Sequence, residues 1–157
     1  MSILVVDDNE TVRELFEVAL EGGGHRDVIT VDSAAAAFSF LKLDSPLTTS
    51  SPPIDLVLLD IVMPDVDGIQ ACTRIRRDPR YADVPIVMTT SLDDMQSVDN
   101  AFKCGSTDYL TKPLKVVDLL ARVRSTLILK AECERRNARE HDLMQFVPFN
   151  FSQPQSS

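Results

Sequence analysis

Residues 56–68 read LVLLDIVMPDVDG, and they hold the clearest indication of the architecture. The run from Leu56 to Leu59 is unbroken and apolar, as in a strand that a parallel sheet buries on both faces. It ends on Asp60, whose ionised carboxylate is costly to desolvate unless a partner compensates the charge. Asp60 either marks the point where the strand reaches water, as aspartate before a turn often does, or stands there for chemical reasons.

The amino-acid composition fits one globular domain and little more. Of the 157 residues, 44% are hydrophobic and 25% are charged, as is typical of a folded protein. The net charge of −8 argues against direct binding of nucleic acid or of an anionic membrane. Three cysteines without a CxxC motif indicate reduced thiols. No apolar run is long enough for a signal peptide or a membrane span, so we expect a cytoplasmic protein without membrane contact.

Short apolar runs alternate with helical patterns along the chain. Strands are predicted at residues 3–6, 28–31, 56–59, 85–89 and 109–110. Helices are predicted from about residue 12 to a glycine stop at 22–24, from 34 to about 43, from 68 to 76, from about 94 to 105, and from about 114 onward. This alternation predicts an α/β protein with a parallel sheet covered by helices on both faces. Residues 44–53, DSPLTTSSPP, are predicted to form a surface loop.

Polar residues stand where the predicted strands end. They are Asp7, Asp8, Asp60, Thr89, Thr90, Thr111 and Lys112. Because ligands of open parallel sheets bind outside the carboxyl ends of the strands, we expect these side chains to converge at one edge. Carboxylates that share a site repel one another and need a cation between them. A small, partly hydrated cluster of oxygen ligands suits Mg²⁺.

These residues resemble the receiver domain of bacterial two-component response regulators. The resemblance rests on Asp7-Asp8, LLDIVMPDVDG, PIVMTTS and DYLTKP, which occur in this order between Ile3 and about Lys130. It implies a flavodoxin-like, doubly wound sheet of five parallel strands in the order 2-1-3-4-5, with five helices. We therefore expect a receiver domain at residues 1–130 and a helical extension with an apolar and polar tail at 131–157.

The resemblance also implies roles for the residues of the site. Asp60 is implied to be the phosphoacceptor, which takes the phosphoryl group from a phosphohistidine of a sensor histidine kinase or phosphotransfer protein. Mg²⁺ is implied to be held by Asp8 and Asp60, by Asp7 mainly through a bound water, and by the backbone carbonyl of Val62. In this family the peptide bond at Lys112-Pro113 is typically cis.

Lys112 is implied to bring a positive charge to a phosphoryl oxygen, and Thr90 to bring its hydroxyl. Thr90 and Tyr109 are implied to move together as the conformational switch. Read in isolation, Lys112 could instead pair with Asp8, Thr89 could be mistaken for the switch residue, and Tyr109 could be an ordinary half-buried tyrosine of an edge strand. The domain is expected to catalyse only its own phosphorylation and dephosphorylation, and not to be an enzyme in the wider sense.

A phosphatase and a nucleotide-binding module are the two alternative functions. A Mg²⁺-dependent phosphatase of the haloacid dehalogenase type also uses an aspartate nucleophile at a strand end. It needs a second aspartate two residues later, where this chain has Val62. A nucleotide-binding module would need a glycine-rich phosphate loop after the first strand, where Asp7, Asp8 and Asn9 stand instead.

Two positions beside the predicted site are apolar. Val62 lies two residues past Asp60 and Leu92 lies two residues past Thr90. In the family these positions flank the path of the hydrolytic water. We therefore predict a long-lived phosphorylated form, because neither side chain can orient an attacking water.

The C-terminal residues predict an extension of the last helix. Residues 130–142, KAECERRNAREHD, are mostly good helix formers but lack a strong heptad seam, so a solvated helical tail is one alternative. Apolar residues from Leu143 to Phe151, with Pro148 as the expected helix end, favour an interface. They resemble the linker that joins a receiver to an output enzyme such as a nucleotide cyclase. We expect a homodimer, strengthened by phosphorylation, through the fourth helix, fifth strand and fifth helix, and a downstream effector.

Overall fold

A five-stranded parallel sheet forms the centre of the computed structural model, which describes residues 1–91 and 104–151 and the side chains of 1–91 and 104–140. The strands are β1 (Ser2–Val6), β2 (Asp27–Val31), β3 (Leu56–Asp60), β4 (Ile86–Ser91) and β5 (Asp108–Lys112). They lie in the order β2-β1-β3-β4-β5, and every neighbouring pair is parallel. The predicted doubly wound order 2-1-3-4-5 is therefore confirmed.

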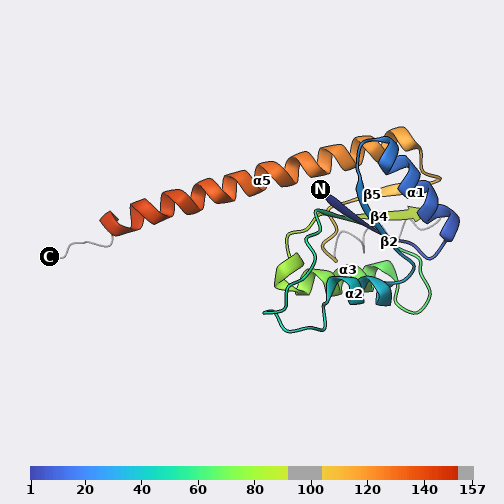
Figure 1. The fold of residues 1–157 in the computed structure, drawn as a ribbon, viewed down its shortest axis with the longest axis horizontal. Helices are drawn as coiled ribbons and strands as arrows, with labels where there is room; N and C mark the ends of the chain where they lie inside the picture. Colours follow the sequence, from blue (N-terminus) through green and yellow to red (C-terminus); the bar gives the residue numbers. More distant parts are fainter. Residues whose placement is uncertain (92–103, 152–157) are drawn as a thin grey trace.

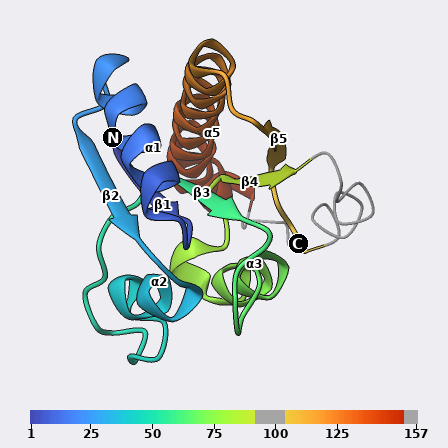
Figure 2. The ribbon, with the colours of Figure 1, turned by 90° about the vertical axis from the view of Figure 1, so that its right-hand side faces the viewer.

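Helices cover both faces of this sheet. Helix α1 (Glu10–Gly22) and the first turns of α5 (Val116–Phe151) lie on one face, while α2 (Ala34–Leu41) and α3 (Gly68–Arg77) lie on the other (Figure 2). A short 3-10 helix, η1 (Pro79–Tyr81), follows α3. The helix predicted from about residue 94 to 105 falls almost entirely on residues 92–103, outside the part that the structure describes.

The predicted helix starts are capped by short polar side chains. Asn9 accepts a hydrogen bond from the backbone N–H of Val12 at 3.1 Å, and Ser33 accepts one from Ala36 at 3.0 Å. At α3, Asp67 and Gln70 form a reciprocal capping box. Each cap satisfies donors that the first turn leaves without an intrahelical partner, so the loops after β1, β2 and β3 lead into helices at fixed positions.

The apolar runs of β1, β3 and β4 fill two separate cores. Alternate residues of these strands, such as Leu4, Leu59 and Met88, pack with α2 and α3. The residues between them, such as Val5 and Leu58, pack with α1 and α5. Burial on both faces explains why these strands read as continuous apolar runs in the sequence.

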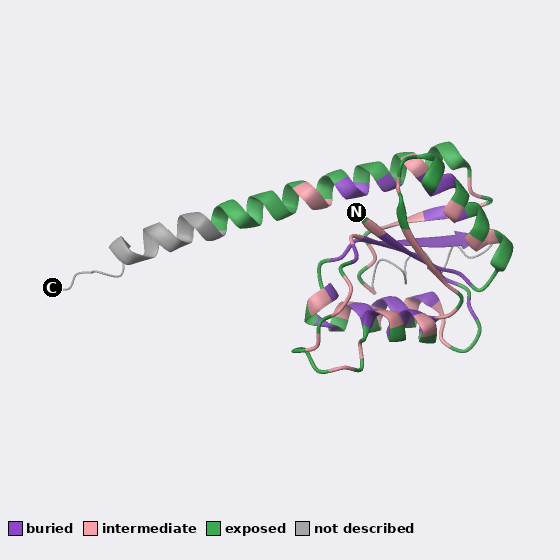
Figure 3. Cartoon of the chain, viewed as in Figure 1, coloured by how far each residue is buried: buried purple, intermediate pink, exposed green. Residues whose placement is uncertain are grey.

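Helix α5 continues far beyond the sheet. It is a single helix from Val116 to Phe151, and its second half projects away from the domain (Figures 1 and 3). The expectation that Pro148 ends the helix is wrong by three residues. Because Pro148 stands in the last turn, its missing N–H removes a bond only at the end of the helix. No helix in the described residues is long and apolar enough to cross a membrane.

Candidate functional site: an acidic cluster at the carboxyl ends of the strands

Three carboxylates meet where β1 and β3 end. One oxygen from each of Asp7, Asp8 and Asp60 lies within 4.8 Å of the others. Asp7 is 1% and Asp60 5% exposed, whereas Asp8 faces solvent. The convergence predicted from the strand ends is therefore present, and two of the three charges lie almost wholly out of water.

The ammonium group of Lys112 lies between the two buried carboxylates. Its Nζ is 3.1 Å from Oδ2 of Asp7 and 3.4 Å from Oδ2 of Asp60. Lys112 is the last residue of β5, and the peptide bond to Pro113 is cis. In the described structure Lys112 thus pairs with Asp7 and Asp60. It does not pair with Asp8, which the sequence alone also allowed as its partner.

The charges of the site are only partly balanced. Burial raises the pKa of Asp60 to about 6, and the nearby charge of Asp7 adds to this increase. Lys112 and the backbone N–H of Val62, which is 3.2 Å from Oδ1 of Asp60, act in the opposite direction but do not cancel it. Burial alone would lower the pKa of Lys112, yet the charges of Asp60 and Asp7 outweigh burial and raise it. One ammonium for three carboxylates leaves room for a further cation.

Neighbouring residues hold Asp7 and Asp60 in place through their backbone and side-chain atoms. Oδ1 of Asp7 accepts a hydrogen bond from the backbone N–H of Asn9 at 2.9 Å. The guanidinium of Arg13 donates to the Asp7 carbonyl at 2.8 Å. Gly68 lies so close to β3 that an added Cβ would be 2.1 Å from the carbonyl oxygen of Asp60. The sequence patterns predicted Gly68 only as a helix start and did not identify Arg13, because both roles depend on distances between separate elements.

The chemistry of these groups fits a magnesium ion. Magnesium prefers oxygen ligands and is held in proteins by one or two carboxylates together with water. Asp7, Asp8 and Asp60 provide such oxygens within reach of one ion. Donors of other kinds, such as thiols or imidazoles, are not part of this cluster in the described residues.

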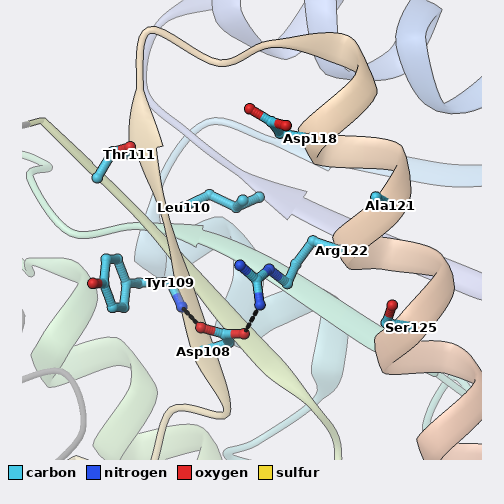
Figure 4. Close-up of a pocket in the computed structure, with 8 residues that line it drawn as sticks. All are labelled: Asp108, Tyr109, Leu110, Thr111, Asp118, Ala121, Arg122 and Ser125. Atoms are coloured by element: carbon cyan, nitrogen blue, oxygen red, sulfur yellow. Dashed lines mark hydrogen bonds and ion pairs between the residues drawn. The ribbon is translucent and has the colours of Figure 1, made fainter.

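Thr90 and Tyr109 lie on the same face of the sheet. Thr90 is buried, and its hydroxyl donates to the carbonyl of Ser91 at 3.2 Å. The strand register places Thr90 beside Thr111, and Tyr109 stands two residues before Thr111 on β5. Figure 4 shows Tyr109 and Thr111 pointing away from α5. Thr89 points to the opposite face, and Leu92 lies outside the described residues.

A hollow of about 490 Å³ separates β5 from α5. Figure 4 shows its lining, in which Arg122 of α5 reaches across to Asp108 at the start of β5. The other lining residues are Tyr109, Leu110, Thr111, Asp118, Ala121 and Ser125. This hollow lies along the edge strand, on the surface predicted for self-association.

Solved signal receiver domains share this doubly wound sheet. The receiver domain of a signal transduction histidine kinase from Syntrophus aciditrophicus has this fold, with a TM-score of 0.69 and 31% identity over 80% of this chain and 89% of that one. The receiver domain of a sensor histidine kinase from Pseudomonas aeruginosa PAO1, solved with magnesium in its active-site cleft, gives a TM-score of 0.67 and 27% identity. The match covers 80% of this chain and 96% of that one.

The response regulator receiver domain family matches residues 3–124, and the chain belongs to this family. Members of the family bind Mg²⁺ in an acidic site of this kind. The DNA-binding transcriptional regulator RpaA of Synechocystis is 38% identical over 125 residues, which cover 80% of this chain and 48% of RpaA. The chain thus spans about half the length of this curated relative. Because RpaA is a DNA-binding regulator, the expectation of no direct nucleic-acid contact finds no support in the comparison.

Proposed function

We propose that the chain receives a phosphoryl group on Asp60 in a two-component signalling system. The observation that carries this proposal is the placement of Asp60, a buried carboxylate beside the Lys112 ammonium and two further carboxylates. Burial and the charge of Asp7 raise the pKa of Asp60, because they disfavour its negative charge. A bound cation would stabilise that charge. A haloacid dehalogenase-type phosphatase is disfavoured, because position 62 carries valine where that mechanism needs its second aspartate.

In the proposed reaction an oxygen of Asp60 attacks the phosphorus atom of a phosphohistidine on a partner kinase or phosphotransfer protein. The new P–O bond forms as the P–N bond breaks, and the electron pair of that bond stays with the imidazole. Such a transfer requires in-line positioning and neutralisation of charge on the phosphoryl oxygens more than proton transfer. Asp60 supplies the fixed position, because it ends β3, which pairs with β1 on one side and β4 on the other.

The other residues supply charge and a readout. Asp7, Asp8, Asp60 and the Val62 carbonyl would hold Mg²⁺, which when bound neutralises phosphoryl oxygens. Lys112 is proposed to move from the carboxylate to a phosphoryl oxygen. Thr90 would then turn its hydroxyl from the Ser91 carbonyl towards the phosphoryl group.

Tyr109 is proposed to follow Thr90. Both side chains lie on the same face of β4 and β5, so displacement of Thr90 opens space into which the tyrosine ring can turn. The ring lies partly buried beside the core formed with α2 and α3. Its movement would change the surface around β5 and α5, which an output domain or a second copy can read.

We further propose that residues 1–130 are the receiver and that residues 131–157 form the extension that transmits its state. The match to RpaA leaves about half of that relative unmatched, which is consistent with an effector that acts with or beyond this chain. The proposed homodimer, strengthened by phosphorylation, uses β5, α5 and the predicted fourth helix, which falls almost entirely outside the described residues. It would place two projecting α5 helices together.

Acetyl phosphate labelling tests the proposed reaction. Incubation with acetyl phosphate and Mg²⁺ should add one phosphoryl group by intact mass, and Asp60→Asn should abolish the addition. Asp65→Asn is the matched control, because Asp65 is exposed near the same site and has a positive φ of 67° that asparagine also adopts. Equal labelling of Asp60→Asn and the parent would contradict the assignment, and transfer from ATP alone would favour a nucleotide-binding function.

A further inference from the structure

Thr89 has a buried hydroxyl without a partner. The residue is 1% exposed, and its Oγ1 makes no hydrogen bond in the described structure. By contrast, Asp7 and Asp60 at the same edge of the sheet both accept hydrogen bonds, and Thr90 donates one. Buried polar atoms are nearly always paired, so an unpaired one beside a reactive group calls for an explanation.

The strand register places this hydroxyl in one row with the carboxylates. Thr89 of β4 is the register partner of Asp60 of β3. On the next strand, Val6 of β1 is the register partner of Leu59 of β3. The residues that follow them, Asp7 and Asp60, therefore lie side by side, and Asp7 belongs to the same row. Register partners on adjacent parallel strands point to the same face. Thr89 therefore lies beside Asp60 on its own side of the sheet, whereas Thr90 lies on the other.

Packing alone does not require this hydroxyl. Thr89 continues the apolar row that includes Val87 and Leu110, which belong to the core beneath α1 and α5. Valine has the same shape and equal or better strand propensity, and it would fill this place without leaving a buried donor unpaired. The hydroxyl therefore destabilises the unphosphorylated state unless another state of the site uses it.

Phosphorylation creates the group that can use it. Before transfer, the two Asp60 oxygens face Lys112 and the Val62 N–H. After transfer, the phosphoryl oxygens compete with Asp60 for the single ammonium of Lys112. An acyl phosphate also presents more acceptor oxygens than a carboxylate, and a hydroxyl is able to donate to one of them.

We propose that Thr89 is a positioning residue for the phosphorylated state, a second hydroxyl that donates to the Asp60 acyl group once Lys112 turns to the phosphoryl oxygens. This inference rests on the proposed function of Asp60, and it assigns to Thr89 a role separate from the switch role of Thr90. The Thr89 hydroxyl, unpaired in the unmodified protein, gains its partner when Asp60 is modified.

Three variants test the proposal with beryllofluoride, which mimics the phosphoryl group, and Mg²⁺ as ligands. We expect Thr89→Val to melt at a higher temperature than the parent without ligand, but to bind beryllofluoride about three- to tenfold more weakly. Thr89→Ser should keep the parent affinity. Thr126→Val is the control, because Thr126 is a buried threonine on α5 whose hydroxyl already has a partner, the Arg122 carbonyl, at 2.8 Å.

The lifetime of the acetyl phosphate-labelled protein gives a second readout. Thr89→Val should lose its label faster than the parent and Thr126→Val, and Thr89→Cys provides a smaller substitution if valine prevents folding. Parent-like affinity and lifetime in the variants without the hydroxyl would overturn the role of Thr89 while leaving Asp60 as phosphoacceptor. A parent protein that neither binds beryllofluoride nor takes the label would instead overturn the proposed function itself.

Discussion

The ionised carboxylate of Asp60 destabilises the folded, unphosphorylated protein. Its pKa rises from 3.8 to about 6 because of burial and the charge of Asp7. Between these values the folded chain holds a proton that the unfolded chain has lost. The contribution of Asp60 to the stability of the fold is therefore fully present below pH 3.8, and it is lost as the pH rises through about 6.

We accordingly expect Asp60→Asn to stabilise the fold near neutral pH. The gain should reach roughly 1–3 kcal/mol without divalent cations, as a shift of about two pKa units implies. The gain in free energy of unfolding should shrink as the pH falls towards about 4. Mg²⁺ should also reduce the gain, because it stabilises the parent. Urea unfolding of both proteins at acidic and neutral pH measures this difference. A variant that is less stable than the parent at neutral pH would contradict the described charge balance.

Val62 tests what limits the lifetime of the phosphorylated form. Its side chain is exposed next to Asp60, and an apolar group there cannot orient an attacking water. We expect Val62→Asn to shorten the lifetime of the labelled protein several-fold, and Val62→Ala, which is also apolar, to change it little. Decay of the label after removal of acetyl phosphate measures the rate. Identical decay of Val62→Asn and the parent would show that this position does not control hydrolysis.

A half-buried ion pair joins helix α5 to the residue before β3, near the point where the helix leaves the domain. Nζ of Lys130 is 2.7 Å from Oδ1 of Asp55, and the other oxygen of Asp55 accepts the backbone N–H of Ser2 at 2.8 Å. Lys130 also contacts Glu134 at 2.6 Å. Burial alone would raise the pKa of Asp55, but the hydrogen bonds from Lys130 and Ser2 and the nearby positive charges together lower it.

We expect Lys130→Met to loosen the C-terminal half of α5. Hydrogen exchange should become faster after Leu127, and the free energy of unfolding should fall by roughly 1 kcal/mol. Glu134→Gln is the matched control, since it removes only the exposed partner. Because the lowered pKa of Asp55 implies stability that is lost as the pH falls through its folded value, the difference between variant and parent should diminish in acid. Unchanged exchange in Lys130→Met would mean that apolar packing alone holds the helix.

The sequence predicts some elements better than others for physical reasons. β1, β3 and β4 are buried on both faces, so they appear as apolar runs. β5 is an edge strand that contains Asp108, Thr111 and Lys112, and only its second and third residues, Tyr109 and Leu110, were predicted. The family motifs single out Asp60 and Lys112 as site residues, but their pairing is visible only in the structure. The unpaired state of Thr89 and the close approach of Gly68 depend on register and on distances between elements, which no local pattern specifies.

The projecting helix has surface available for a partner. Ile128 and Leu129 are 51% and 61% exposed on α5, just before the helix leaves the domain. Neighbouring exposed apolar residues of this size favour an interface. The alternative, a solvated tail, would leave the chain monomeric in every state.

Sedimentation distinguishes these two cases. The full chain should dimerise more strongly with beryllofluoride and Mg²⁺ than without, and a version that ends at Lys130 should dimerise less. Leu129→Glu in the full chain is a second variant that keeps the helix but charges its apolar face. Monomers under all conditions would contradict the dimer and leave the extension as a binding segment for a different partner.

Borohydride reduction locates the phosphoryl group itself. Borohydride reduces an aspartyl phosphate to homoserine, which peptide mass spectrometry assigns to one position. After treatment with acetyl phosphate and Mg²⁺, we expect homoserine at position 60 and at no other aspartate, and none when Mg²⁺ is removed by a chelator. Homoserine at Asp7 or Asp8, or a labelled chain with intact Asp60, would contradict the assignment of Asp60 as the phosphoacceptor.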